Sequence, residues 1–151
     1  MIKIICVGKI KESFYRDAIE EYKKRIQKYS KIEIIEVPDF ALEQPELNRQ
    51  KEKEVILKHI KPREHIVTLE IEGKQYDSVS FADKIDYVFQ NSSTITFIIG
   101  GSDGLANEIK SLSNNAISFS KMTFPHQLFR IILLEQIYRA FKINHNESYH
   151  K

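Results

Sequence analysis

The chain has too few cysteines for an internal disulfide. Cys6 is the only cysteine among 151 residues, and it lies in the apolar run Ile4 to Val7. A lone cysteine in such surroundings is far more often a buried small hydrophobic residue than a reactive thiol. We therefore assign it no chemical role.

Long apolar runs and targeting patterns are also missing. No run approaches the roughly 20 apolar residues that span a bilayer, and Met1 to Ile4 leads directly into a strand pattern without a signal-peptide core. There is no internal repeat, low-complexity segment or linker. With 42% hydrophobic and 29% charged residues, the composition predicts one globular domain, residues 1–151. The lack of a spanning run and of a signal-peptide core predicts a cytoplasmic protein.

Metal-binding motifs are absent as well. The histidines show neither an HExxH pattern nor the paired Cys and His spacing of a zinc site, so we expect no metal. They are His59, His65, His126, His145 and His150.

A strong excess of either charge is lacking, because the net charge is only +2. The distribution is uneven: residues 1–31 carry a net +5, residues 32–118 a net −6 and residues 119–151 a net +3. Basic ends permit a phosphate-rich partner. The alternative is a solvated helix face, and the pI of about 8.5 lies below the value above 9 expected of a dedicated nucleic-acid-binding domain.

What the chain does have is a regular alternation of strand and helix patterns. The predicted strands are Ile2–Val7, Ile32–Val37, His65–Ile71, Thr94–Ile99 and Ala116–Phe119. The predicted helices are Ser13–Tyr29, Leu47–Ile60, Ser80–Phe89, Ala106–Leu112 and Gln127–Ile143. Strands separated by helices favour βαβ crossovers. The pattern therefore predicts an α/β fold with a mainly parallel sheet covered on both faces.

The last predicted helix, Gln127–Ile143, is apolar around most of its circumference. Such a helix is buried on more than one side. In a chain this short, the simplest arrangement packs one face on its own sheet and another on a second copy, which predicts a homodimer. Burial inside a single subunit is the alternative.

Two predicted strands end in loops that lead to helices. The strand Thr94–Ile99 is followed by Gly100-Gly101-Ser102-Asp103-Gly104, and Ala116–Phe119 by the loop Ser120 to His126. Open α/β sheets bind ligands beyond the carboxyl ends of their strands, so these loops predict the site.

The glycine loop has several interpretations. It lacks the Lys-Ser/Thr of a P-loop and the spacing of a dinucleotide motif. Gly100-x-Ser102-x-Gly104 formally matches the nucleophile elbow of a serine hydrolase, with His126 or His145 available downstream. Alternatively, the glycines let the backbone approach a bulky ligand, or form a plain tight turn.

Several motifs together resemble one known family. They are Ile98 to Leu105, Ser118 to His126 (Ser-Phe-Ser-Lys-Met-Thr-Phe-Pro-His), Glu135 to Ala140 and the terminal Tyr149-His150-Lys151. In order and spacing they resemble the small SPOUT-class methyltransferases that modify N3 of a pseudouridine in large-subunit ribosomal RNA. The resemblance covers the whole chain.

The resemblance implies a fold and a cofactor. The fold is a Rossmann-like α/β sheet whose C-terminal segment forms a deep trefoil knot, a rare exception among proteins. The knot forms the pocket for S-adenosyl-L-methionine. By motif match, the cofactor-binding residues are Leu69, Gly100, Gly101, Phe119, Ser120, Lys121, Met122, Thr123 and Phe124. Core packing is the alternative for the apolar members of this set.

The resemblance also implies which residues act on the substrate. The acceptor is an imide nitrogen, which must lose its proton during methylation, so a general base or a stabilising cation would help. The catalytic candidates are His150, Tyr149 and Arg139, with Glu135 as the ion-pair partner of Arg139. The candidates for contacts with RNA are His126, Arg130 and Lys151. A structural ion pair is the alternative for Glu135 and Arg139.

The tail Asn144–Lys151 has no apolar periodicity, so we expect it to gain little order from packing in its own subunit. In a dimer the tail could reach the partner's site. The resemblance implies ribosomal RNA as the macromolecular partner. The small size of the domain favours the assembled ribosome as the substrate, because its shape would supply contacts. A non-catalytic RNA-binding domain remains a third function class, although it makes no use of the glycine and Ser-Lys-Met-Thr-Phe loops.

Overall fold

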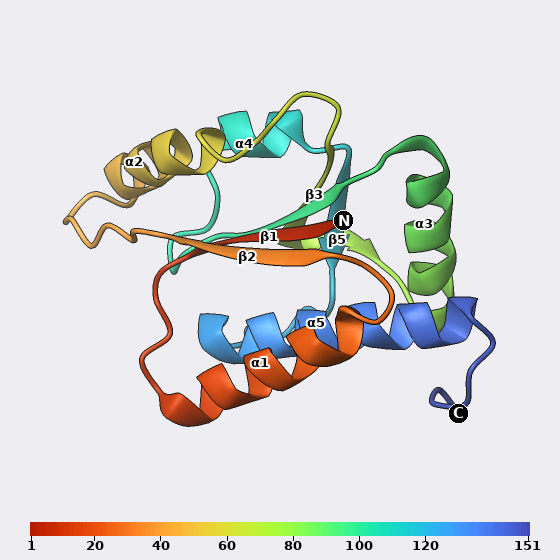
Figure 1. Ribbon diagram of the computed structural model, residues 1–151. Coiled ribbons are helices and arrows are strands. Elements are labelled where there is room, and N and C mark those ends of the chain that lie inside the picture. The colour runs from red at the N-terminus through yellow and green to blue at the C-terminus, as the bar shows by residue number, and fades with distance from the viewer.

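The computed structural model describes all residues from 1 to 151 and alternates strictly between strands and helices (Figure 1). The strands are β1 (Ile2–Val7), β2 (Ile32–Val37), β3 (His65–Gln75), β4 (Ile95–Ile99) and β5 (Asn115–Ser118). The helices are α1 (Ser13–Ile26), α2 (Pro45–Leu57), α3 (Ser78–Asn91), α4 (Asn107–Leu112) and α5 (His126–Asn144). The predicted alternation is confirmed.

The strands form one sheet in the order β2-β1-β4-β3-β5, and every neighbouring pair is parallel. This confirms the predicted parallel sheet. From β1 the chain moves outward to β2, whereas from β4 it passes beyond β3 to β5. Parallel strands bring their carboxyl ends to one edge, and connections that diverge there leave room for a ligand.

Helices cover both faces of the sheet, with α2 and α4 on one face and α1 and α5 on the other (Figure 1). Two hydrophobic clusters occupy the two interfaces. The larger contains residues of α1, α3 and α5 packed on β1, β3, β4 and β5, and the smaller joins α2 and α4 to the opposite face. The near-continuous apolar strands β1 and β4 are buried along their whole length, as a parallel sheet requires.

Strand β3 is longer than the sequence pattern predicts. Its pairing with β5 breaks after Leu69 and resumes at Lys74, so the four residues between them bulge out of the ladder. Gly73 lies in this bulge, and a Cβ built there would stand 2.7 Å from backbone atoms of Ala116 and Ile117. Only a residue without a side chain lets the two backbones pass this closely.

Other element ends differ by a few residues. Helix α3 begins at Ser78 because the Asp77 carboxylate accepts a hydrogen bond from the Ser80 backbone N–H at 2.7 Å, an N-cap that the apolar pattern did not register. Helix α1 ends at Ile26, and a turn follows to Tyr29. No helix combines the length and apolar character that crossing a membrane requires.

The long helix α5 packs against the sheet and against both α1 and α3. This contact buries Leu133, Leu134, Ile137, Ala140 and Phe141. Another strip stays partly uncovered: Leu128 is exposed, and Ile131 and Ile132 are half-buried. Part of the apolar surface of α5 is therefore buried within the subunit, and the homodimer stays a prediction.

The close approach at Gly73 predicts a specific loss of stability. In Gly73→Ala, the new Cβ would meet the β5 backbone, so the strand must move at a cost of about 1–3 kcal/mol. In a chain of this size each kcal/mol lowers Tm by about 2–4 °C. Thermal unfolding measures the effect, with Glu72→Ala at the exposed neighbouring position as the control. An unchanged Tm would contradict the packing described.

Candidate functional site

A cavity of about 380 Å³ lies where β3, β4 and β5 end. Three chain segments form its walls: 69–72 from the β3 bulge, 99–105 after β4 and 117–124 after β5. The start of α5 closes the remaining side with His126 and Phe129. The two strand-end loops that the sequence pattern singles out therefore meet at one cavity.

All but one of the residues predicted to bind the cofactor line this cavity. Those that line it are Leu69, Gly100, Gly101, Phe119, Ser120, Met122, Thr123 and Phe124. Lys121 is exposed beside it and does not form part of the wall. The structure brings these residues together, and their role in binding a cofactor stays a prediction.

The glycine loop is a tight turn at the mouth of β4. The Gly104 N–H donates to the Gly101 carbonyl at 3.0 Å, and Gly104 has a φ of +79°, which favours glycine. A Cβ on Gly100 would stand 3.0 Å from the Gly104 carbonyl group. Glycine at position 100 therefore lets the turn fold back on itself and keeps its backbone open to the cavity.

Aromatic rings form the apolar wall of the cavity. Phe124 stacks on Phe129 with ring centroids 6.2 Å apart, and Phe119 meets Phe129 edge-on at 5.3 Å. The Ser120 hydroxyl accepts from the Met122 N–H at 3.0 Å, which holds the loop after β5 in shape. The resulting wall is flat and apolar beside exposed backbone, a combination that suits a heteroaromatic ring.

Two charged residues of the site belong to the start of α5. His126 is half-buried on the cavity wall, and burial, followed by the nearby Arg130 charge, lowers its pKa below the usual value. Arg130 is buried, and its guanidinium pairs with Glu36 at 2.6 Å. It also donates to the carbonyls of Val7 and Gly8, at 3.1 and 2.7 Å.

Arg130 is thus held inside its own subunit by Glu36 and two backbone carbonyls, and only its Nε–H lacks a partner. An RNA phosphate could replace the Glu36 carboxylate only by breaking this ion pair, so the predicted contact of Arg130 with RNA stays a prediction.

The C-terminal tail packs on α5 instead of extending freely, contrary to the expectation from its sequence. The Tyr149 ring meets Tyr138 edge-on at 5.0 Å, and its hydroxyl donates to Glu135 at 3.2 Å. Arg139 bonds Glu135 on one side and the His150 ring nitrogen, at 3.1 Å, on the other. Aromatic and ionic contacts therefore order the tail, and a search for apolar periodicity does not detect such contacts.

The four predicted residues Glu135, Arg139, Tyr149 and His150 form one cluster. Their hydrogen bonds raise the pKa of Arg139, chiefly through Glu135, and burial raises the pKa of Tyr149. The cavity touches α5 at His126 and Phe129, and at 1.5 Å per residue Arg139 lies about 15 Å beyond Phe129 along the helix. The tail and the cavity of one subunit therefore lie at opposite ends of α5.

Ser102 does not have the surroundings of a hydrolase nucleophile. It lies exposed at the tip of the turn closed by Gly101 and Gly104, and α4 begins only at Asn107. Its hydroxyl makes no hydrogen bond to a histidine. Nothing here supports a nucleophile elbow.

Sequence reasoning missed two buried polar residues on α2. Asn48 and Glu52 are 2% and 4% exposed, and they hold two loops together. Asn48 bonds both backbone groups of Leu42 and the Asp103 carboxylate, while Glu52 accepts from the Phe40 N–H at 3.0 Å. The only available signal was their i, i+4 spacing on a helix with few apolar residues.

Comparison with known proteins identifies the class. Residues 1–150 match a family model described as "Predicted SPOUT methyltransferase". This chain belongs to the SPOUT methyltransferase family.

Relatives share nearly the whole chain. It is 50% identical to "Ribosomal RNA large subunit methyltransferase H" of Clostridium botulinum (strain 657 / Type Ba4), over 99% of both chains. It is 49% identical to the protein of that name in Caldicellulosiruptor saccharolyticus, over 100% of both. It is 54% identical to the "Putative ribosomal RNA large subunit methyltransferase H" of Methanococcus maripaludis, over 99% of both.

Solved structures support the fold. A probable methylase family protein from Haemophilus influenzae matches with a TM-score of 0.62 at 11% identity, over 99% of this chain and 70% of that one. The SpoU methyltransferase AviRb from Streptomyces viridochromogenes matches with a TM-score of 0.51 at 12% identity, over 98% and 62%.

Glu52 yields a prediction about pH and stability. Burial above all, with the nearby Asp103 and Asp39, raises its pKa in the folded state. A carboxyl with a raised folded pKa binds more protons folded than unfolded, so stability falls as pH rises above its unfolded pKa of about 4.3, until the folded pKa is passed. Glu52→Gln keeps an acceptor for the Phe40 N–H and removes the buried charge.

We therefore expect Glu52→Gln to have a higher Tm than the wild type at pH 7.5, with a gain that shrinks toward pH 4. Thermal unfolding across this range measures it. Glu54→Gln, exposed on the same helix, is the matched control and should show no gain. A Tm at pH 7.5 that is unchanged or lower in Glu52→Gln would contradict the assignment.

Proposed function

We propose that this protein transfers a methyl group from S-adenosyl-L-methionine to N3 of a pseudouridine in large-subunit ribosomal RNA. The names of relatives that match the chain from end to end support the substrate class. The donor and the acceptor atom follow from the family resemblance. The same resemblance predicts the trefoil knot, and ribosomal RNA as a partner predicts the cytoplasm.

The observation that carries the proposal is the cavity at the ends of β3, β4 and β5. Its volume of about 380 Å³ lies in the range of small-molecule sites. The rings of Phe119, Phe124 and Phe129 offer an apolar wall for a purine, and the turn at Gly100 keeps backbone groups within reach of its polar edge. These residues fit S-adenosyl-L-methionine.

When bound, S-adenosyl-L-methionine supplies a methyl group on a positively charged sulfur. During transfer to N3, the acceptor would pass its proton to a base of the site, and the donor would be released as a neutral thioether. The protein aligns the two reactants and keeps water out. Half-buried His126, with its lowered pKa, and the His150 ring are two candidate proton acceptors.

The active site is proposed to combine two subunits. Within one subunit the tail cluster lies far along α5 from the cavity, so it cannot act there. If a second copy covers the partly uncovered strip of Leu128, Ile131 and Ile132 in antiparallel fashion, its tail comes to the cavity. Tyr149 and His150 then position the acceptor, and Arg139 holds His150 in place.

The first test separates donor binding from the hydrolase alternative. Val at Gly101 would press on Val7 and Glu52, whose atoms stand 3.1 and 3.3 Å from a Cβ built there, and so displace the turn. Calorimetry with S-adenosyl-L-methionine should show at least a tenfold loss of affinity, on the order of 1.4 kcal/mol. Ser102→Ala should keep both affinity and methyl transfer.

Circular dichroism verifies the fold of Gly101→Val, and Thr123→Trp, at an exposed position on the cavity wall, blocks the cavity without changing the turn. Wild-type affinity in both folded variants would remove the cavity from the donor site. Loss of activity in Ser102→Ala, with labelling of Ser102 by a fluorophosphonate, would favour the hydrolase.

The second test concerns the tail. Deleting Tyr149–Lys151 should leave dimerisation and S-adenosyl-L-methionine affinity nearly intact, because these residues lie away from both the cavity and the buried face of α5. Methyl transfer to ribosomal RNA should fall at least a hundredfold. Sedimentation, calorimetry and transfer of a labelled methyl group measure the three properties.

Mixing subunits then assigns the tail. A heterodimer of the tail deletion with Gly101→Val keeps one intact cavity facing one intact tail, so activity should return at one site. Full activity of the truncated homodimer, or no recovery in a verified heterodimer, would contradict a site shared between subunits.

A further inference from the structure

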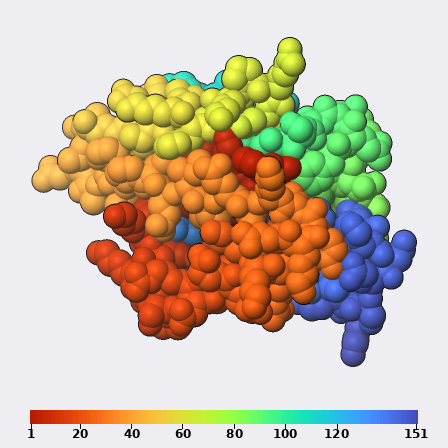
Figure 2. All heavy atoms as spheres, viewed as in Figure 1, coloured from red at the N-terminus to blue at the C-terminus, as the bar shows by residue number.

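A second, wider cleft adjoins the cavity. It lies beyond the ends of β1 and β2, between the loop that follows β1 and residues 38–42, and has a volume of about 850 Å³. Gly101, Ser102 and His126 line both the cleft and the cavity. In Figure 2, blue atoms of the C-terminal third are visible in the hollow between the red and orange segments. A ligand in the cleft would therefore touch the wall of the cavity.

The cleft has a built polar floor. Asn48 and Glu52 reach it from α2 and Arg130 from α5, and all three are less than 5% exposed. Through Leu42, Phe40 and Asp103, the two α2 residues hold the loop after β2 against the glycine turn. Buried polar residues are costly unless they are bonded, so this arrangement is more than a gap between loops.

The floor also has unused hydrogen-bonding groups. Two buried side-chain nitrogen or oxygen atoms in the whole chain lack a hydrogen-bond partner, Glu52 Oε1 and Arg130 Nε. Both residues line this cleft, one from each face of the sheet. One atom is an acceptor and the other a donor, the two kinds of group that the edge of a nucleobase complements.

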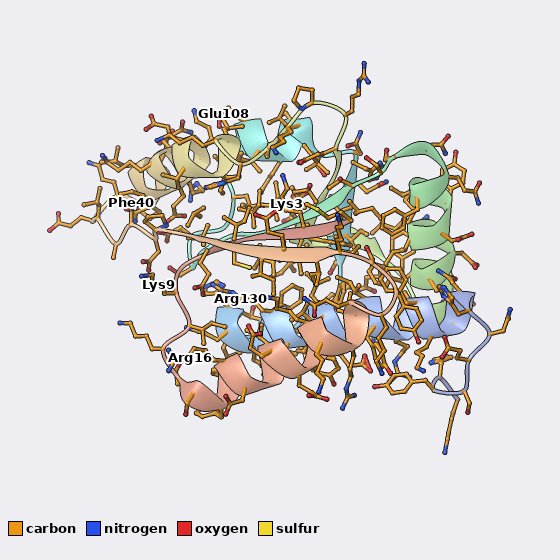
Figure 3. All side chains as sticks on the ribbon, viewed as in Figure 1. Lys3, Lys9, Arg16, Phe40, Glu108 and Arg130 are labelled. Atoms are coloured by element: carbon orange, nitrogen blue, oxygen red, sulfur yellow. The ribbon has the colours of Figure 1, made fainter.

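The rim carries the groups that contact nucleotides. Lys9 and Lys11 are exposed on the loop after β1, and the Phe40 ring lies half-exposed on the loop after β2. Phe40, Lys9 and Arg130 project at the same end of the sheet (Figure 3). Lysines attract phosphate, and an aromatic ring gives a base a surface on which to stack.

Carboxylates alternate with these lysines, but several are already engaged. Glu36 pairs with Arg130, and Asp103 accepts from Asn48. Glu12 and Asp39 remain exposed on the rim. A lining that mixes ammonium, carboxylate and aromatic groups suits one extruded nucleotide, which carries a phosphate, N–H donors and a flat ring.

We propose that this cleft is the subsite for the acceptor nucleotide of the RNA. The Phe40 ring stacks on a base of the RNA segment, Lys9 and Lys11 take its phosphates, and the reacting edge faces the wall that the cleft shares with the cavity. The inference rests on the proposed function, since it needs a methyl donor in the adjoining cavity.

The test compares variants at the rim with matched controls at the opposite end. The rim variants are Phe40→Ala and the double variant Lys9→Gln with Lys11→Gln. The controls are Tyr87→Ala, an exposed aromatic on α3, and Lys58→Gln with Lys61→Gln, exposed lysines between α2 and β3. The substrate is ribosomes purified from cells that lack this enzyme.

Each rim variant should raise the KM for ribosomes about tenfold, while calorimetry shows S-adenosyl-L-methionine affinity within twofold of wild type. Both controls should keep the wild-type KM. Rim variants with an unchanged KM, or control variants with an equal rise, would overturn the inference and leave the proposed function standing. A wild-type protein that neither binds S-adenosyl-L-methionine nor transfers methyl would overturn both.

Photocrosslinking keeps the test independent of how the variants fold. Wild-type protein is irradiated with RNA that carries 4-thiouridine in place of uridine, and the crosslinked peptides are sequenced. Crosslinks within residues 9–12 or 38–42 are expected. Crosslinks confined to other segments would overturn the proposed subsite.

Discussion

The buried guanidinium of Arg130 links the parts on which this molecule depends. It joins the first turns of α5 to the ends of β1 and β2 through the carbonyls of Val7 and Gly8 and the carboxylate of Glu36. Where α5 begins decides where His126 and Phe129 stand, and these residues close the cavity. A charge this deeply buried is stable only when its ion pair and hydrogen bonds are well aligned. These contacts therefore fix the position of the first turn of α5.

Around this anchor, the carboxyl edge of the sheet is divided into two sites. The ends of β3, β4 and β5 form an apolar cavity with backbone groups at its edge, and the ends of β1 and β2 form a polar cleft. The glycine turn after β4 separates them. The proposed reaction joins two reactants of different character, a purine-bearing donor and an RNA nucleotide. The two sites offer each reactant a surface of matching character, on opposite sides of the glycine turn.

The sequence predicted those features that depend on local patterns. Strand and helix alternation, the parallel sheet and the two strand-end loops all follow from periodicity and from glycine placement. It could not predict the extension of β3 past its bulge at Gly73, because that depends on how closely another strand passes. The burial of Arg130 and the packing of Tyr149 on α5 could not be predicted for the same reason. Both depend on partners far away in the sequence, and without them a polar side chain is expected to face solvent.

Above all, we propose that the cavity at the ends of β3, β4 and β5 holds the methyl donor. A crystal structure of the protein grown with S-adenosyl-L-methionine tests it most directly. We expect the adenine ring against the segment Phe119 to Phe124, within contact distance of Leu69 and the Gly100 backbone. Density for the donor at another place, with this cavity empty and accessible in the crystal, would contradict it.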